Sequence, residues 1–163
     1  MVMSSVPPAT NSGSRRPGRQ AARGPILTPK WSFQGVYLRV GPIPATSVVV
    51  IERTAVHSGD ADLADVFGPA EHALRNVERG KFGLLVDVRL VPGRNDPEFE
   101  KRFQPYRQRL QRGFRRVAIV VETTYGKLQC QRYAREDGTT NTVFDDYVAA
   151  VTWLDDTSVH RAR

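Results

Sequence analysis

Residues 82–121 read FGLLVDVRLVPGRNDPEFEKRFQPYRQRLQRGFRRVAIVV, and this stretch decides the fold. Two apolar runs, Phe82–Val88 and Val117–Val121, enclose a segment from Pro97 to about Gln111 with helical periodicity. Its large apolar side chains follow at spacings of four, three and four and form one stripe: Phe99, Phe103, Tyr106 and Leu110. Continuous apolar runs are typical of strands covered on both faces. The stretch therefore predicts two parallel strands joined by a crossover helix.

Two strands and a helix are predicted before this unit. Gly35–Val40 alternates between apolar and polar side chains, as expected of an edge strand, and Ser47–Ile51 is a β-branched run typical of a buried strand. Residues 62–79 have the periodicity of a helix, with Gly80 as its C-terminal stop. Gly68-Pro69 interrupts that pattern and predicts either a lead-in turn before a helix starting at Pro69 or one kinked helix.

After the unit we expect a helix over about Tyr125–Arg135, a short strand at Thr142–Phe144 and a last helix capped by Asp145. The element order β-β-α-β-α-β-α-β-α predicts an α/β fold. Its sheet is mostly parallel, with about five strands, one antiparallel edge strand and four helices.

The C-terminal segment VFDDYVAAVTWL is similar to the last unit of the STAS and SpoIIAA-like superfamily. The matching residues are Phe144, Asp145, Ala149, Ala150, Trp153 and Leu154, and together with the element order the resemblance covers about residues 34–154. It implies a bacterial, non-enzymatic regulatory module that docks on a protein partner such as an anti-sigma factor or kinase.

The family's phosphorylated serine follows a strand-end Asp, which Asp87 matches. Counting about eight residues onward reaches Asn95, followed by Asp96 and Pro97 where the serines would lie. Because this sequence has no hydroxyl there, two interpretations stay open. Asp96 supplies a permanent negative charge in place of the phosphate, or it is an ordinary helix N-cap with Pro97 at the first helical position.

The net charge of the 163 residues is +7, and it is unevenly distributed. Residues 1–30 contain no acidic residue and five basic ones: Arg15, Arg16, Arg19, Arg23 and Lys30. Residues 31–163 hold 19 basic and 17 acidic residues. We predict a disordered basic arm (1–30), a SpoIIAA-like domain (31–154) and a flexible tail (155–163). The arm is either solvated or contacts nucleic acid, an anionic membrane or an acidic protein.

Several functional classes find no support in the sequence. No apolar run is long enough to span a bilayer, and the N-terminus lacks the apolar core of a signal peptide, so we expect a cytoplasmic protein. His57, His72 and His160 share no short motif with Cys130, the single cysteine. We therefore expect no catalytic, cofactor-binding or metal-binding residues.

The candidate site lies at the carboxyl ends of the parallel strands, where α/β proteins bind ligands. Two loops leave neighbouring strands there and contribute Asp87, Arg89, Arg94, Asn95 and Asp96 from one loop and Thr123, Thr124 and Lys127 from the other. The alternative for Thr123-Thr124 is a simple N-cap. We add Arg102 and Arg109 of the basic stretch 101–116, whose alternative is a solvated helix face.

The sequence thus favours a protein-binding module at this edge. A second possibility is an adaptor that binds nucleic acid or an anionic membrane through the arm and the 101–116 helix. A third is a small-ligand or lipid sensor. The remoter CRAL-TRIO lipid-carrier fold shares the core topology but requires a large apolar pocket, for which a domain of this size leaves little room.

Overall fold

The computed structural model describes residues 27–94 and 96–157. Six strands form one sheet in the order β1-β2-β3-β4-β5-β6. They are β1 (Phe33–Gln34), β2 (Leu38–Pro42), β3 (Val48–Arg53), β4 (Gly83–Asp87), β5 (Arg116–Val120) and β6 (Thr142–Phe144). The helices are α1 (Leu63–Ala73), α2 (Pro97–Gln111), α3 (Thr124–Glu136) and α4 (Tyr147–Asp155), with a 3-10 turn at Arg79–Lys81.

Strands β1, β2 and β3 pair antiparallel, and β3 to β6 run parallel. The register places Ile51 beside Val86, Val86 beside Ile119 and Ile119 beside Val143. The predicted α/β class, mostly parallel sheet, antiparallel edge and four helices are confirmed. The sheet has six strands rather than about five because two residues before the predicted edge strand, Phe33 and Gln34, pair with β2.

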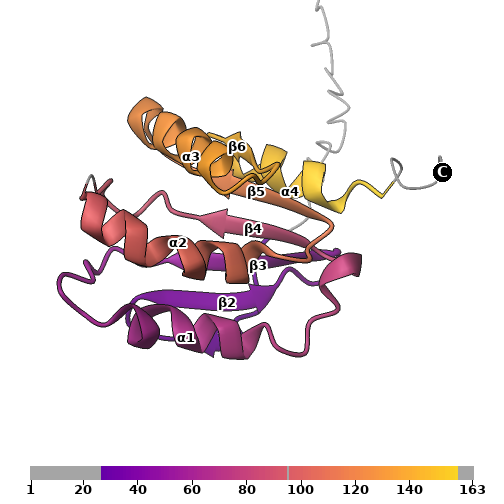
Figure 1. Ribbon diagram of the computed structural model, residues 1–163. Helices are drawn as coiled ribbons and strands as arrows, with labels where there is room; N and C mark the ends of the chain where they lie inside the picture. The colour runs from indigo at the N-terminus through magenta and orange to yellow at the C-terminus, as the bar shows by residue number, and fades with distance from the viewer. Residues whose placement is uncertain (1–26, 95, 158–163) are drawn as a thin grey trace, which may run out of the picture.

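Helices α1, α2 and α3 lie on one face of the sheet, and α4 lies on the other (Figure 1). This follows from the strand order, since successive right-handed crossovers between neighbouring parallel strands place their helices on the same side. Along β4, Leu84 belongs to the core beneath α1 and α2, whereas Leu85 belongs to the core beneath α4. Alternate residues are therefore buried on opposite faces, which explains the continuous apolar runs.

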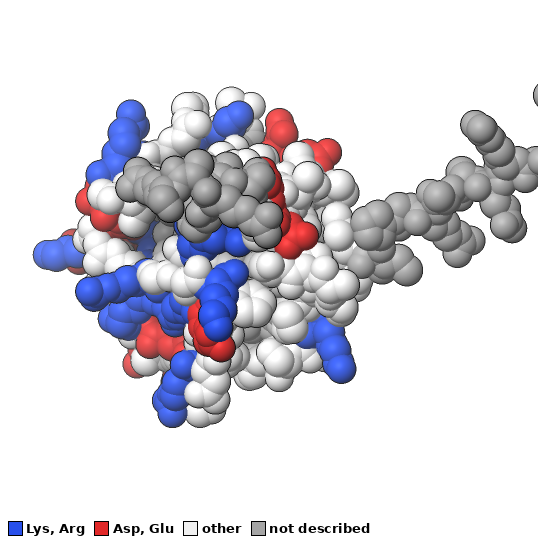
Figure 2. Space-filling model, turned by 90° about the vertical axis from the view of Figure 1, so that its right-hand side faces the viewer, with Lys and Arg blue, Asp and Glu red and all other residues white. Residues whose placement is uncertain are grey.

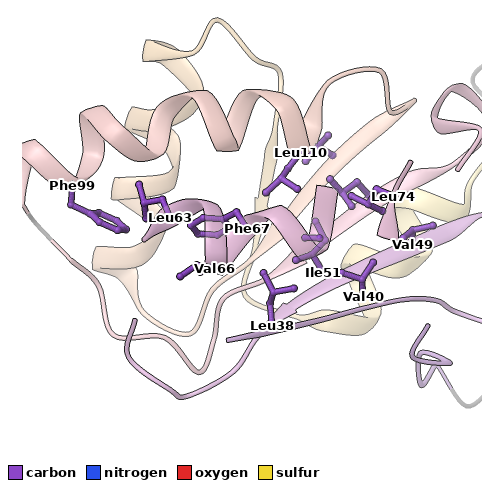
Figure 3. Packing of buried hydrophobic residues seen from close by; sticks show 13 residues of the cluster. Leu38, Val40, Val49, Ile51, Leu63, Val66, Phe67, Leu74, Phe99 and Leu110 are labelled. Atoms are coloured by element: carbon purple, nitrogen blue, oxygen red, sulfur yellow. The ribbon is translucent and has the colours of Figure 1, made fainter. Parts of the chain in front are cut away.

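The core beneath α1 and α2 is built from the predicted periodicity (Figure 3). Leu63, Val66 and Phe67 of α1 and Phe99 and Leu110 of α2 are buried against the strands. Phe103 stacks on Phe67 with the ring centroids 4.7 Å apart. The aromatic stripe of α2 thus packs α2 onto α1 as well as onto the sheet.

The helix predicted over residues 62–79 is shorter, because α1 ends at Ala73. Gly80 is not a helix stop but part of the 3-10 turn, whose Arg79 donates hydrogen bonds to the carbonyls of Arg109 and Arg112. Because these hydrogen bonds attach Arg79 to the end of α2, the chain there does not continue α1. α1 runs through Pro69 as a single helix, and Gly68 permits this because it has no Cβ to clash with the proline ring.

The C-terminal segment fixes α4 against the sheet. The cap is Asp146 rather than Asp145, since its side chain accepts from the N–H of Ala149 at 2.7 Å. Arg116 donates to the carbonyl of Trp153 at 2.7 Å, which satisfies an acceptor in the last turn of α4.

At both predicted domain boundaries, residues assigned to the arm or the tail are structured. Most of the arm, including Arg15, Arg16, Arg19 and Arg23, and most of the tail lie outside the described residues. Lys30, placed in the arm by sequence, donates its N–H to Pro42 at 2.8 Å. Asp155, placed in the tail, accepts from the N–H of Ser47 at 2.7 Å. Within the described ranges, no helix has the length and apolar character needed to cross a membrane.

Candidate functional site

The carboxyl ends of β3, β4 and β5 meet at one edge of the sheet, on the side where α2 begins (Figure 1). Side-chain hydrogen bonds join the loops that leave this edge. Arg94 donates to the carbonyl of Gly59 at 3.0 Å, and Gln129 of α3 donates to the carbonyl of Arg94 at 2.6 Å. The structure therefore brings together the β3–α1 loop, the β4–α2 loop and the start of α3, as expected from the topology.

Asp87 is buried and supports Arg89. The Asp87 carboxylate accepts from Nε of Arg89 at 3.0 Å and from Nη2 at 2.7 Å, and this hydrogen bonding raises the pKa of Arg89. The Arg89 guanidinium also lies 5.2 Å from the ring centre of Tyr147. Asp87 follows Leu85 on the face of the sheet that α4 covers, so it does not share a site with Thr123 and Thr124. Its position corrects the grouping drawn from the sequence.

Asp96 is the N-cap of α2. One carboxylate oxygen accepts from the N–H groups of Glu98 and Phe99 at 3.1 and 3.3 Å, and the other accepts from Arg94 at 2.8 Å. The hydrogen bond from Arg94 lowers the pKa of Asp96. Both oxygens therefore serve the local structure, which favours the capping interpretation over a phosphate mimic. Asn95 lies outside the described residues.

Thr123 is the N-cap of α3, with its hydroxyl accepting from the N–H of Gly126 at 3.0 Å. Thr124 is the exposed first residue of that helix, and Lys127 is partly exposed one turn later. The capping alternative weighed for this loop is thus confirmed. Thr124 and Lys127 remain available on the surface.

Arg102 and Arg109 do not join this edge. Arg109 forms an ion pair with Glu71 of α1 at 2.9 Å and lies over the ring of Tyr106, and Arg102 is exposed. Other arginines of the basic stretch hold the fold, since Arg115 donates to the carbonyl of Leu154. The face of the molecule on the side where α4 ends shows Lys and Arg interspersed with Asp and Glu (Figure 2).

A cleft of about 420 Å³ lies between α2 and α3, and the sequence did not predict it. Its apolar lining includes Val86, Phe99, Phe103, Ile119 and Val121. The α3 positions that line it carry no large aliphatic side chain: Gly126, Gln129, Cys130 and Tyr133, with Asp137 after the helix. The expectation from sequence concerned a large apolar pocket, for which a domain of this size leaves little room; a cleft of this size with a partly polar lining was not predicted.

Polar contacts bridge the two helices beside the cleft. Arg107 of α2 forms an ion pair with Asp137, and their side chains are only 7% and 2% exposed. Glu100 accepts hydrogen bonds from Arg132 at 2.6 Å and from the hydroxyl of Tyr133 at 2.9 Å. No site role was predicted for Arg107, because the sequence does not distinguish it from the other arginines of the stretch 101–116.

Burial governs the ionisation of the two titratable α3 side chains in the cleft. It raises the pKa of Cys130 to about 11, so the thiol stays protonated near neutral pH. Burial and the hydrogen bond to Glu100 raise the pKa of Tyr133 to about 12. In residues 27–94 and 96–157, no three His, Cys, Asp or Glu side chains are grouped as metal ligands would be.

Replacing Tyr133 by phenylalanine is expected to reduce the loss of stability at alkaline pH. The folded-state pKa of Tyr133, about 12, exceeds the ordinary value of about 10. The stability that the protonated Tyr133 contributes is therefore fully present below pH 10 and is lost as the pH rises through 12. Urea unfolding of wild type and Tyr133→Phe, repeated as the pH is raised from 10 to 12, would measure how the free energy of unfolding changes in each protein. Parallel pH dependence of the two proteins would contradict the assignment.

Exposed apolar side chains gather at the same edge. Six large apolar residues are exposed in the described ranges, and five belong to loops or helix turns at the carboxyl edge: Val36, Val56, Leu90, Tyr125 and Leu128. Val36 reaches this edge because its carbonyl accepts from the hydroxyl of Thr54, just after β3. The sixth, Val148, lies on α4. We call these five residues the carboxyl-edge surface.

No family model and no curated protein matches this chain. A search of solved structures finds similarity to an uncharacterized protein of the DUF3478 family from Shewanella loihica PV-4. The two are 14% identical, the match covers 75% of this chain and 98% of that chain, and the TM-score is 0.47. That protein is described as having a SpoIIAA-like fold.

Proposed function

We propose that this protein is a non-enzymatic regulatory module that docks a protein partner on its carboxyl-edge surface. The observation that carries the proposal is the gathering of five of the six exposed large apolar side chains of the described ranges at one edge. Single exposed apolar residues are normal on a protein surface, but five that share one edge of the sheet are candidates for an interaction surface.

The composition of this surface suits a protein partner. Leu90, Tyr125 and Leu128 are 56%, 53% and 61% exposed and supply large apolar anchors. Tyr125 is held in place, because its ring packs against Gly93 so closely that a Cβ there would lie 3.0 Å from it. Arg89 and the exposed Thr124 supply polar groups at the rim. An apolar centre with aromatic and arginine side chains is the usual anatomy of a binding surface.

The double variant Tyr125→Ala/Leu128→Ala is expected to lose partner binding and keep its fold. Truncating two central anchors costs on the order of 2 kcal/mol or more, about thirtyfold in affinity. Affinity capture followed by titration of the captured partner measures the loss, and circular dichroism verifies the fold.

Val148→Ala is the matched control, since it removes an equally exposed apolar side chain from α4 (58% exposed). Full binding by this control, with loss in the double variant, supports docking at the carboxyl edge. Equal binding by both variants would refute the proposed surface.

A second candidate is the adaptor function, for which the support is the charge of residues 1–30, with five basic residues and no acidic residue. Deleting residues 1–26, which include four of these basic residues and spare the structured Lys30, should abolish salt-sensitive binding to nucleic acid or anionic vesicles and leave docking at the carboxyl edge intact. Unchanged binding to nucleic acid and vesicles after the deletion would count against the arm.

A further inference from the structure

The cleft between α2 and α3 has the size and lining of a small-molecule site. Its volume of about 420 Å³ falls within the usual range for ligand pockets, about 300–1,000 Å³. Val86 and Ile119 of the sheet form its floor, and Phe99 and Phe103 of α2 form an apolar wall. The loop from Val88 to Arg94 lines the end that meets the carboxyl edge. The cleft can thus take up an apolar molecule of modest size.

The cleft is held open by bonds between the elements around it. Asp137 accepts from Arg107 at 2.9 and 3.0 Å and from Gln104 at 3.0 Å, which ties the end of α3 to α2. Arg132 and Tyr133 bond to Glu100 nearer the start of α2. These contacts fix the spacing of the two helices. A ligand would therefore enter a preformed site and would not have to order it.

Three of the four arginines that line the cleft are paired with carboxylates, and one has no such partner among the described residues. The residues that line it include four arginines, Arg53, Arg89, Arg94 and Arg107, but two carboxylates, Glu122 and Asp137. Arg89 and Arg94 pair with Asp87 and Asp96, outside the lining. Arg53 is only 9% exposed and forms no ion pair with any described residue, and burial lowers its pKa. Arg53 is thus the lining cation that an anion could approach without competing with a protein carboxylate, and it favours an anion over a cationic molecule.

Arg107 offers a specific donor for that anion. It binds Asp137 through Nε and Nη2, so Nη1 lies on the opposite edge of the guanidinium. Nη1 is buried and has no acceptor among the described residues. The guanidinium lies between the rings of Phe103 and Tyr133, with 5.3 and 4.0 Å to the ring centres, which fixes its plane. A buried N–H without an acceptor is costly, and because Arg107 lines the cleft, a ligand oxygen that reaches Nη1 would satisfy it.

We propose that the cleft binds a small organic carboxylate with an apolar body. The body packs against Phe99, Phe103 and Ile119, and the carboxylate accepts a hydrogen bond from Nη1 of Arg107. Arg53 adds positive potential from the side of the cleft nearer α1. This site adjoins the docking surface, since Leu90 belongs to both, but binding in the cleft does not depend on a protein partner.

Decanoate, decanol and decylamine are suitable probes, since they share an apolar chain and differ in the charge of the head group. We expect saturable binding of decanoate to the full chain in calorimetry, at least about tenfold tighter than decanol, and no measurable binding of decylamine. Equal affinity for decanoate and decanol, or no saturable binding of either, would overturn the proposal.

The single cysteine locates the bound probe, because Cys130 lines the cleft. Saturating decanoate should slow alkylation of Cys130 by iodoacetamide, measured by intact-protein mass spectrometry. Cys130→Phe should fill the cleft and abolish decanoate binding, whereas Gln131→Phe, at the exposed next position, should leave it unchanged. Undiminished binding by Cys130→Phe would show that decanoate binds elsewhere and would refute the site.

Two variants test the charge assignment. Arg107→Lys keeps a cation but removes the Nη1 donor, and we expect the preference for decanoate over decanol to fall about tenfold. Arg53→Met removes a cation without leaving a partner carboxylate unpaired, so it tests the same preference should Arg107→Lys fail to fold. A preference equal to wild type in the folded variants would overturn the anion assignment.

Discussion

Replacing Arg107 by methionine is expected to lower the free energy of unfolding by about 3–5 kcal/mol. The Arg107 side chain is 7% exposed and that of Asp137 is 2% exposed, so the variant leaves a carboxylate in the interior without its counter-ion. The Asp137 carboxylate then accepts only one side-chain hydrogen bond, from Gln104. Urea denaturation followed by circular dichroism measures the change.

Arg109→Met is the matched control on the same helix. Arg109 also forms an ion pair, with Glu71 at 2.9 Å, but its side chain is 51% exposed. Solvent-exposed pairs contribute at most about 1 kcal/mol, so this variant should remain close to wild type. The double variant Arg107→Met/Asp137→Asn should recover most of the loss, because it removes the orphaned charge. Equal losses for Arg107→Met and Arg109→Met would contradict the buried ion pair.

The burial of Arg107 and its ion pair could not be predicted from the sequence. The stripe of Phe99, Phe103 and Leu110 was predictable because helical periodicity is local. The caps at Asp96 and Thr123 were predictable for the same reason, since each bonds to N–H groups within three residues. The partner of Arg107 lies 30 residues away, in what the sequence presents as an ordinary Asp-Gly turn. No local pattern distinguishes Arg107 from the exposed arginines around it.

The candidate site was predicted in part for a related reason. Parallel strands place successive loops at one edge, so the meeting of the β4–α2 loop with the start of α3 follows from topology. The direction of each side chain depends on the strand register, which the sequence left undetermined. Asp87 therefore lies on the α4 face, away from Thr123. The cleft could not be predicted, because it depends on the spacing of α2 and α3, which hydrogen bonds between distant residues determine.

Replacing Gly41 by alanine is expected to destabilise the fold by about 3 kcal/mol or more, at or above the upper end for overpacking in a core. A Cβ at Gly41 would lie 2.2 Å from the carbonyl oxygen of Lys30 and 2.8 Å from the Cα of Trp31. These are backbone atoms, so no rotamer change relieves the clash. Hydrogen bonds from Lys30 to Pro42 and from Ser32 to Val40 hold the segment in place on either side.

Gly80→Ala is the control for this substitution, because a Cβ at Gly80 would meet no atom within 4 Å. Its free energy of unfolding should stay within about 0.5 kcal/mol of wild type. If the strain in Gly41→Ala is relieved by detaching the N-terminal segment, the tryptophan fluorescence, measured in a Trp153→Phe background so that it reports Trp31, will shift to longer wavelength before the helices unfold. Wild-type stability in Gly41→Ala, with unchanged fluorescence, would mean that residues 30–32 do not pack against β2, and the antiparallel edge of the sheet would then need another support.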